Sequence, residues 1–72
     1  MKKFEGYSKT QLLECIDEWV IGLNAERNRA IMKRKVIDGL SDFAIAEEFD
    51  LSHKRVNTIS RKYQKVLLEH LE

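Results

Sequence analysis

Seven polar side chains gather between residues 53 and 65, and every one of them can donate hydrogen bonds. They are His53, Lys54, Arg55, Asn57, Thr58, Arg61 and Lys65. Residues 52–66 hold five basic side chains and no acidic one. Arginine can donate a pair of hydrogen bonds to guanine and asparagine can bond adenine, whereas lysine and threonine commonly contact phosphate. These residue types therefore predict contact with double-stranded DNA.

The apolar residues of the same segment repeat at helical spacing. Counting about 100° per residue, they form one stripe that consists of Val56, Ile59, Tyr63, Val66 and Leu67. The predicted DNA-contacting residues lie opposite this stripe or at its margins. A helix with an apolar inner side and a basic, amide-bearing outer side meets the requirement for lying in a major groove. A solvated helix face is the alternative for any single one of these residues.

A tight turn and a shorter helix precede the basic helix. Ser41 is the predicted N-cap of a helix over about residues 42–49, and Ser52 is the predicted N-cap of the basic helix. Ala46, Phe49, Leu51, Val56 and Ile59 have the spacing that packs two short helices across a turn of three to four residues. We therefore predict a helix-turn-helix over about residues 41–67. Its combination of cap, turn and basic face favours DNA binding over a merely solvated surface.

Two more helices are predicted upstream of this motif. Ser8 and Gln11 form a capping box at the start of the first, which extends over about residues 8–22. Its apolar side consists of Leu12, Ile16, Trp19, Val20 and Leu23, with Trp19 as the expected anchor of the core. The second helix extends over about residues 25–38, with Asn24 as N-cap and Gly39 as C-cap. An all-α, four-helix single domain over residues 8–72 follows, preceded by a flexible lead-in over residues 1–7.

Composition excludes several other classes of protein. The 72 residues are enough for one domain, and the single cysteine, Cys15, cannot form an internal disulfide. Cys15, His53 and His70 do not have the spacing of metal ligands. The first residues lack the apolar run of a signal peptide, and no segment approaches the roughly 20 apolar residues that span a bilayer. We expect a cytoplasmic protein that does not contact membranes, needs no cofactor and is not an enzyme.

Residues 23–67 resemble the −35-element-binding domain of bacterial sigma factors. The matching residues are Leu23, residues 26–29 (ERNR), residues 39–41 (GLS), residues 45–48 (IAEE), residues 51–52 (LS) and Val56. The same pattern is similar to the DNA-binding module of LuxR-type response regulators. Asp50 stands where those families usually have glycine, and Lys33 and Arg34 stand where they tend to have apolar residues. The resemblance implies a stand-alone, sequence-specific DNA-binding domain that regulates transcription, of a kind found in small phage and prophage proteins.

Three further interpretations stay open at this point. The domain could bind RNA polymerase or a regulator through its acidic surfaces, which are residues 42–50 and the outer side of the first helix. It could instead assist DNA packaging or transposition in a phage. Leu68 and Leu71 point away from the stripe of the last helix and could form the seam of a homodimer, with a frayed terminus as the alternative.

Overall fold

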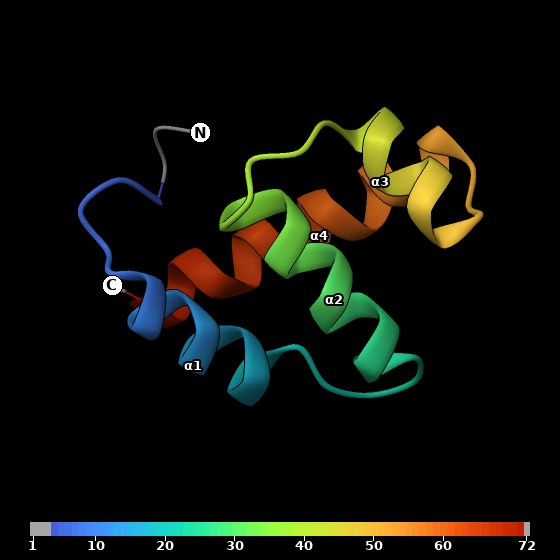
Figure 1. The fold of residues 1–72 in the computed structure, drawn as a ribbon. Coiled ribbons are helices and arrows are strands. Elements are labelled where there is room, and N and C mark those ends of the chain that lie inside the picture. The colour runs from blue at the N-terminus through green and yellow to red at the C-terminus, as the bar shows by residue number, and fades with distance from the viewer. Residues whose placement is uncertain (1–3, 72) are drawn as a thin grey trace.

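Four helices make up the protein in a computed structural model, which describes residues 4–71. They are α1 (Lys9–Trp19), α2 (Ala25–Val36), α3 (Asp42–Phe49) and α4 (His53–Leu71), and residues 4–71 contain no strand. α4 crosses the molecule and packs against all three other helices, with its first half beside α3 and its last turns beside α1 (Figure 1). The predicted all-α fold with four helices is confirmed. Residues 1–3 of the predicted lead-in, and Glu72, lie outside the described residues.

Serine side chains begin three of the helices. The Ser8 hydroxyl accepts a hydrogen bond from the Gln11 backbone N–H at 3.1 Å, and the Gln11 side chain accepts one from the Ser8 N–H at 2.8 Å. The Ser41 hydroxyl accepts from the Ala44 N–H at 3.2 Å, and the Ser52 hydroxyl accepts from the Arg55 N–H at 3.0 Å. These bonds satisfy backbone donors that have no partner within the helix, and they confirm all three predicted caps.

The junction between α1 and α2 differs from the prediction. α1 ends at Trp19 rather than near residue 22, and Asn24 precedes α2 without any cap bond from its side chain. Asn24 instead has left-handed backbone angles, with φ at 61° and ψ at 26°. At its other end α2 stops at Val36, two residues earlier than expected, and the chain turns through Gly39 at φ +71°.

The core lies where the four helices meet. Its buried apolar side chains are Phe4, Leu12, Cys15, Ile16, Val20, Ile31, Met32, Ile45, Ala46, Val56, Ile59, Tyr63 and Leu67. Phe4 thus packs into the core from the segment predicted as a lead-in, with only 5% of its surface exposed. Leu68 and Leu71 are partly buried against the same core.

Two expected core residues of the first helix lie at the surface. Trp19 is 36% exposed, and its ring stacks on His70 of α4 with 3.5 Å between ring centroids. Leu23 is 89% exposed. Both predictions were wrong. Trp19 is the last residue of α1 and stacks on His70 at the surface instead of entering the core, and the helical spacing does not continue beyond it to residue 23. The loop then turns Leu23 outward between Gly22, at φ +96°, and Asn24.

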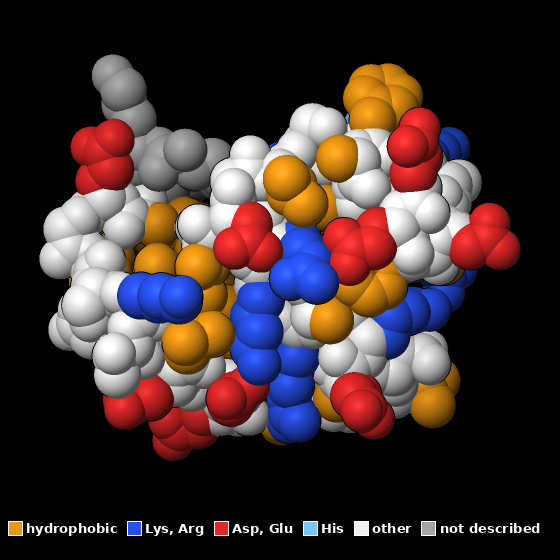
Figure 2. Space-filling view, in the orientation of Figure 1, with side chains coloured by type: hydrophobic (Ala, Val, Ile, Leu, Met, Phe, Trp, Pro, Cys, Tyr) orange, Lys and Arg blue, Asp and Glu red, His pale blue; other side chains and the backbone are white. Residues whose placement is uncertain are grey.

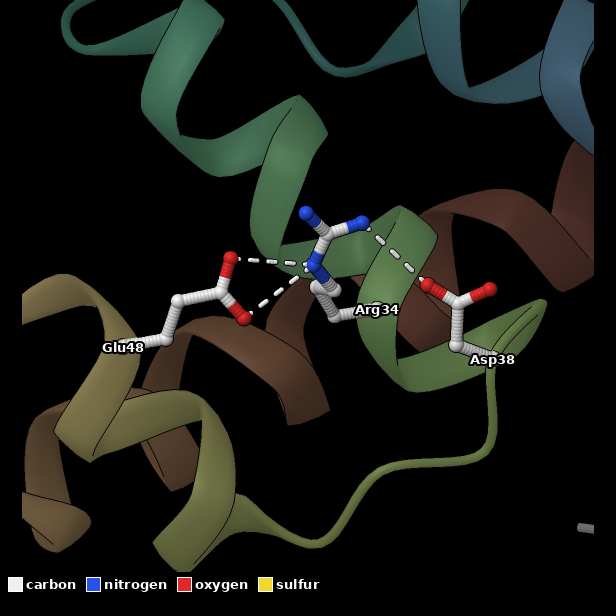
Figure 3. A network of polar contacts seen from close by, with 3 residues as sticks. All are labelled: Arg34, Asp38 and Glu48. Carbon is white, nitrogen blue, oxygen red and sulfur yellow. Dashed lines mark hydrogen bonds and ion pairs between the residues drawn. The ribbon is translucent and has the colours of Figure 1, made fainter.

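Ion pairs hold Lys33 and Arg34, two basic residues of α2, against neighbouring segments of the chain. Lys33 pairs with Asp17 of α1 at 3.2 Å. Arg34 pairs with Glu48 of α3 at 3.0 Å and with Asp38 at 3.2 Å, so that its guanidinium lies between two carboxylates (Figure 3). The outer side of α2 therefore joins its neighbours through charge rather than through apolar contact.

The turn between α3 and α4 consists of residues 50–52. Asp50 has left-handed backbone angles, with φ at 54° and ψ at 46°. The Leu51 N–H bonds back to the Ala46 carbonyl at 3.0 Å and the Asp50 N–H to the Glu47 carbonyl at 3.4 Å, which is the hydrogen-bond pattern of a Schellman motif. Asp50 thus adopts the left-handed conformation that usually favours glycine.

Candidate functional site

The outward side of α4 holds the seven residues predicted to contact DNA. Six of them are exposed, namely His53, Lys54, Arg55, Thr58, Arg61 and Lys65, whereas Asn57 is half-buried. Val56, Ile59, Tyr63 and Leu67 of the predicted apolar stripe are buried, and Val66 is half-buried. Gln64, which lies outside the predicted apolar stripe, is buried and donates a hydrogen bond to the Ser60 hydroxyl at 2.6 Å. The helix is therefore amphipathic, and its buried side includes Ser60 and Gln64 in addition to the predicted apolar stripe.

Asn57 is engaged within the protein. Its side-chain N–H donates to Asp42 Oδ2 at 3.0 Å, and Asp42 Oδ1 lies 3.0 Å from the Lys35 ammonium. This cluster joins α2, α3 and α4 and was not foreseen, because its three members are far apart in the sequence. Asn57 keeps its carbonyl oxygen as an acceptor, while one of its two N–H donors is used by Asp42.

The Asp42 carboxyl is ionised more readily than an ordinary aspartate. Burial alone would raise its pKa, but hydrogen bonds from Asn57 and Lys35 act in the opposite direction, together with the charges of Lys35 and His53. Together these hydrogen bonds and charges outweigh burial, and the pKa of Asp42 lies below its ordinary value of 3.8. The cluster therefore keeps a carboxylate at the start of α3 throughout the physiological pH range, where the helix dipole also favours negative charge.

Two more of the seven residues make contacts inside the protein. The His53 ring stacks on Phe43 of α3, with 3.9 Å between ring centroids and 7° between the ring planes. Phe43 is itself 67% exposed, so this pair forms an aromatic surface at the junction of α3 and α4. The Thr58 hydroxyl donates to the Lys54 carbonyl at 3.0 Å, which leaves its oxygen free to accept.

Among residues 4–71, carboxylates neutralise three of the five Lys and Arg side chains of α2 but none of those of α4. Lys33, Arg34 and Lys35 of α2 all pair with carboxylates, and these contacts are the four ion pairs found among residues 4–71. Within the same range, none of Lys54, Arg55, Arg61, Lys62 and Lys65 pairs with a carboxylate. Figure 2 shows the α2 side of the molecule, where Lys and Arg side chains alternate with Asp and Glu. Of the eight Lys and Arg side chains in residues 4–71 that pair with no carboxylate, five therefore lie on α4, and the others are Lys9 of α1 and Arg27 and Arg29 of α2.

Neither a metal-binding cluster nor a membrane-spanning helix occurs in the part of the chain that the structure describes. No group of three His, Cys, Asp or Glu side chains in residues 4–71 could hold a metal ion. None of the helices in that range is long and apolar enough to cross a membrane. Cys15 is buried, with its Sγ 3.9 Å from the Leu67 carbonyl oxygen. Burial, followed by the nearby charge of Glu18, raises the pKa of this thiol.

Comparison of the chain with protein-family models, with curated proteins and with solved structures finds no match.

Proposed function

We propose that this protein binds double-stranded DNA, with α3, residues 50–52 and α4 acting as a helix-turn-helix and α4 as the helix that enters the major groove. The observation that supports it most is the row of cations on α4 that pair with no carboxylate among residues 4–71, on a helix whose opposite side is buried in the core. Exposed cations of this kind bind phosphate by releasing counterions.

The seven predicted residues take different roles in this proposal. Arg55 and Arg61 are exposed and free to donate to base edges or phosphates, and Lys54 and Lys65 supply point charges. His53 and Thr58 contribute exposed polar atoms at the start of the helix. Asn57 acts through Asp42 to hold α4 against α3, because this bond already uses one of its N–H donors.

The resemblance to the sigma-factor domain supports transcription regulation as the biological role of the DNA contact. A single small domain makes few base contacts, so useful affinity requires a second copy or a protein partner such as RNA polymerase. One of the two acidic surfaces that could bind such a partner, over residues 42–50, has fewer free carboxylates than the sequence indicates. Asp42 and Glu48 are occupied by cations of α2, which leaves Glu47 and Asp50 as its exposed acids without an ion pair in the described chain.

Titration of a random duplex pool, followed by selection of the bound sequences, tests the proposal directly. We expect binding whose affinity falls steeply with salt, with a logarithmic slope of about 0.9 for each phosphate contacted. Charge reversal by Arg61→Glu should abolish the selection of bound duplexes, whereas Lys9→Glu on α1, an exposed residue with no ion pair among residues 4–71, changes the net charge equally and should preserve it. A palindromic selected site would indicate a dimer. Absence of binding to any duplex at low salt would refute the proposal.

A further inference from the structure

A groove of about 530 Å³ runs between the start of α2 and the first half of α4. Its basic residues are Arg27 from α2 and Lys54, Arg55 and Lys62 from α4, and no acidic residue lines it. Leu23, Ile59 and Tyr63 provide apolar surface within the same groove. This volume lies within the usual range for ligand-binding clefts, which combine an apolar surface with a few polar groups.

The apolar wall of the groove is held in place by the loop before α2. Leu23 stands between two residues with positive φ, Gly22 and Asn24, and the Ala25 N–H bonds back to the Gly22 carbonyl at 3.1 Å. The Arg29 guanidinium donates to the Val20 carbonyl at 2.8 Å, which ties the loop to α2. These contacts hold the loop backbone on both sides of Leu23, whose apolar side chain is 89% exposed at the edge of a basic groove.

The cations of the groove are also partly positioned. Both Nε and Nη2 of Arg27 donate to the side-chain oxygen of Asn28, at 3.3 and 3.2 Å, and Asn28 is buried. The Lys62 ammonium lies 5.2 Å from the centre of the Tyr63 ring, within the range of a cation–π contact. Neither cation pairs with a carboxylate among residues 4–71.

We propose that this groove binds an acidic peptide segment of a partner protein, with one apolar side chain of that segment seated on Leu23, Ile59 and Tyr63. Charge complementarity selects an anionic partner, since four cations face the groove without an acid. A bare phosphate or a nucleic-acid backbone would satisfy these cations but would leave Leu23 in water, whereas a peptide with an apolar side chain covers it. An anchor in a pocket surrounded by charged contacts is the usual arrangement of a small protein interface.

Peptide binding would exclude DNA, because Lys54, Arg55 and Thr58 belong both to the groove and to the proposed DNA-contacting side of α4. The inference that a bound peptide excludes DNA rests on the proposed function. The partner would then act as a competitive inhibitor of DNA binding, and its acidic segment would stand in for phosphate.

The test uses the full chain and a short fluorescent peptide of glutamates with one central leucine. We expect saturable binding by fluorescence anisotropy and NMR shift changes that centre on Leu23, Arg27 and Ile59. Exchange of the peptide leucine for alanine should weaken binding about tenfold, as should Leu23→Ser, because each removes apolar burial. The two changes together should cost less than their sum, since they remove the same contact. Leu23 is almost fully exposed, so its substitution should leave the circular dichroism spectrum unchanged.

Two charge variants separate this proposal from DNA binding. Lys65→Glu on α4 lies outside the groove and should weaken DNA binding while it preserves peptide binding. Lys9→Glu on α1 makes the same change of charge far along the chain and should preserve both. Equal affinity for the leucine and alanine peptides would overturn the proposal, because the attraction would then be charge alone. Binding to vesicles of anionic lipid but not to the peptide would also overturn it. A peptide that binds without displacing a duplex would refute the competition only.

Discussion

The Asn57 side chain donates a hydrogen bond to Asp42 across the interface of α3 and α4, at 3.0 Å. The same carboxylate pairs with Lys35 of α2, so two partly buried contacts of Asp42 link three helices. These contacts help to set how α4 lies against α2 and α3. Asn57, predicted from the sequence to contact DNA, thus contributes to the placement of the helix.

Loss of the Asn57 side chain should reduce the stability of the folded protein. Asn57→Ala removes a hydrogen bond to a charged group, which is worth about 1.5–3 kcal/mol. We expect a loss of that order in the free energy of unfolding measured by urea denaturation. Thr58→Ala, on the same helix and exposed, should cost less because its bond only returns to the helix backbone. Equal losses for the two variants would contradict a special role for Asn57.

Acid should weaken the contact between α2, α3 and α4. The pKa of Asp42 is lowered in the folded protein, so the folded carboxylate binds its proton less tightly than the unfolded one. The stabilisation is fully present above a pH of about 4 and is lost as the pH falls through the folded pKa. The stability difference between the wild type and Asp42→Asn should therefore shrink below about pH 4 in urea titrations. A difference that stays constant down to the lowest pH would show that Asp42 is not the group responsible.

Glycine at position 50 should stabilise the turn. Asp50 has φ at 54°, a conformation that costs an ordinary residue about 1–2 kcal/mol and glycine very little. Part of the gain is offset by the greater freedom of glycine in the unfolded chain, so we expect Asp50→Gly to gain up to about 1 kcal/mol. Thermal denaturation measures the change. Asp50→Val serves as the opposite control and should lower the melting temperature, because branched side chains tolerate this conformation poorly.

The stack of Trp19 on His70 should be visible in fluorescence. Trp19 is the chain's one tryptophan, and its ring lies 3° from parallel with the His70 ring. His70→Ala uncovers the indole, so we expect its emission to shift to longer wavelength, with a loss of stability of about 0.5–1.5 kcal/mol. His53→Ala removes the other histidine stack, on Phe43, and should leave the emission spectrum unchanged.

Cys15 should react slowly with thiol reagents while the protein is folded. Its side chain is buried and its pKa is raised, chiefly by burial, so little of the reactive thiolate is present. We expect the rate of modification by a disulfide reagent to rise sharply across the urea unfolding transition. A fast reaction without urea would mean that α1 separates readily from α4, where the Leu67 carbonyl faces this thiol.

Much of the fold could be predicted because it depends on neighbours in the sequence. Ser8, Ser41 and Ser52 each cap a helix by bonding a backbone N–H three residues away, and such bonds depend on local geometry alone. The amphipathic pattern of α4 is likewise a matter of helical spacing, and its inner side packs as expected. The left-handed conformation of Asp50 is also a local feature, because the turn that ends α3 requires one left-handed residue.

Only the packing of the helices shows which polar side chains are engaged inside the protein and which are free to contact a ligand. Asn57 and Asp42 are 15 residues apart, and Arg34 and Glu48 are 14 apart, so no local pattern pairs them. Trp19 and Leu23 share the apolar character of core residues, but the chain leaves the helix at Trp19 and the core is filled without them. The number of helices, three of their starting points and the basic side of α4 could be predicted, because short-range bonds and helical spacing govern them. Packing determined which cations keep their charge unpaired, because ion pairs form only where folding brings distant segments together.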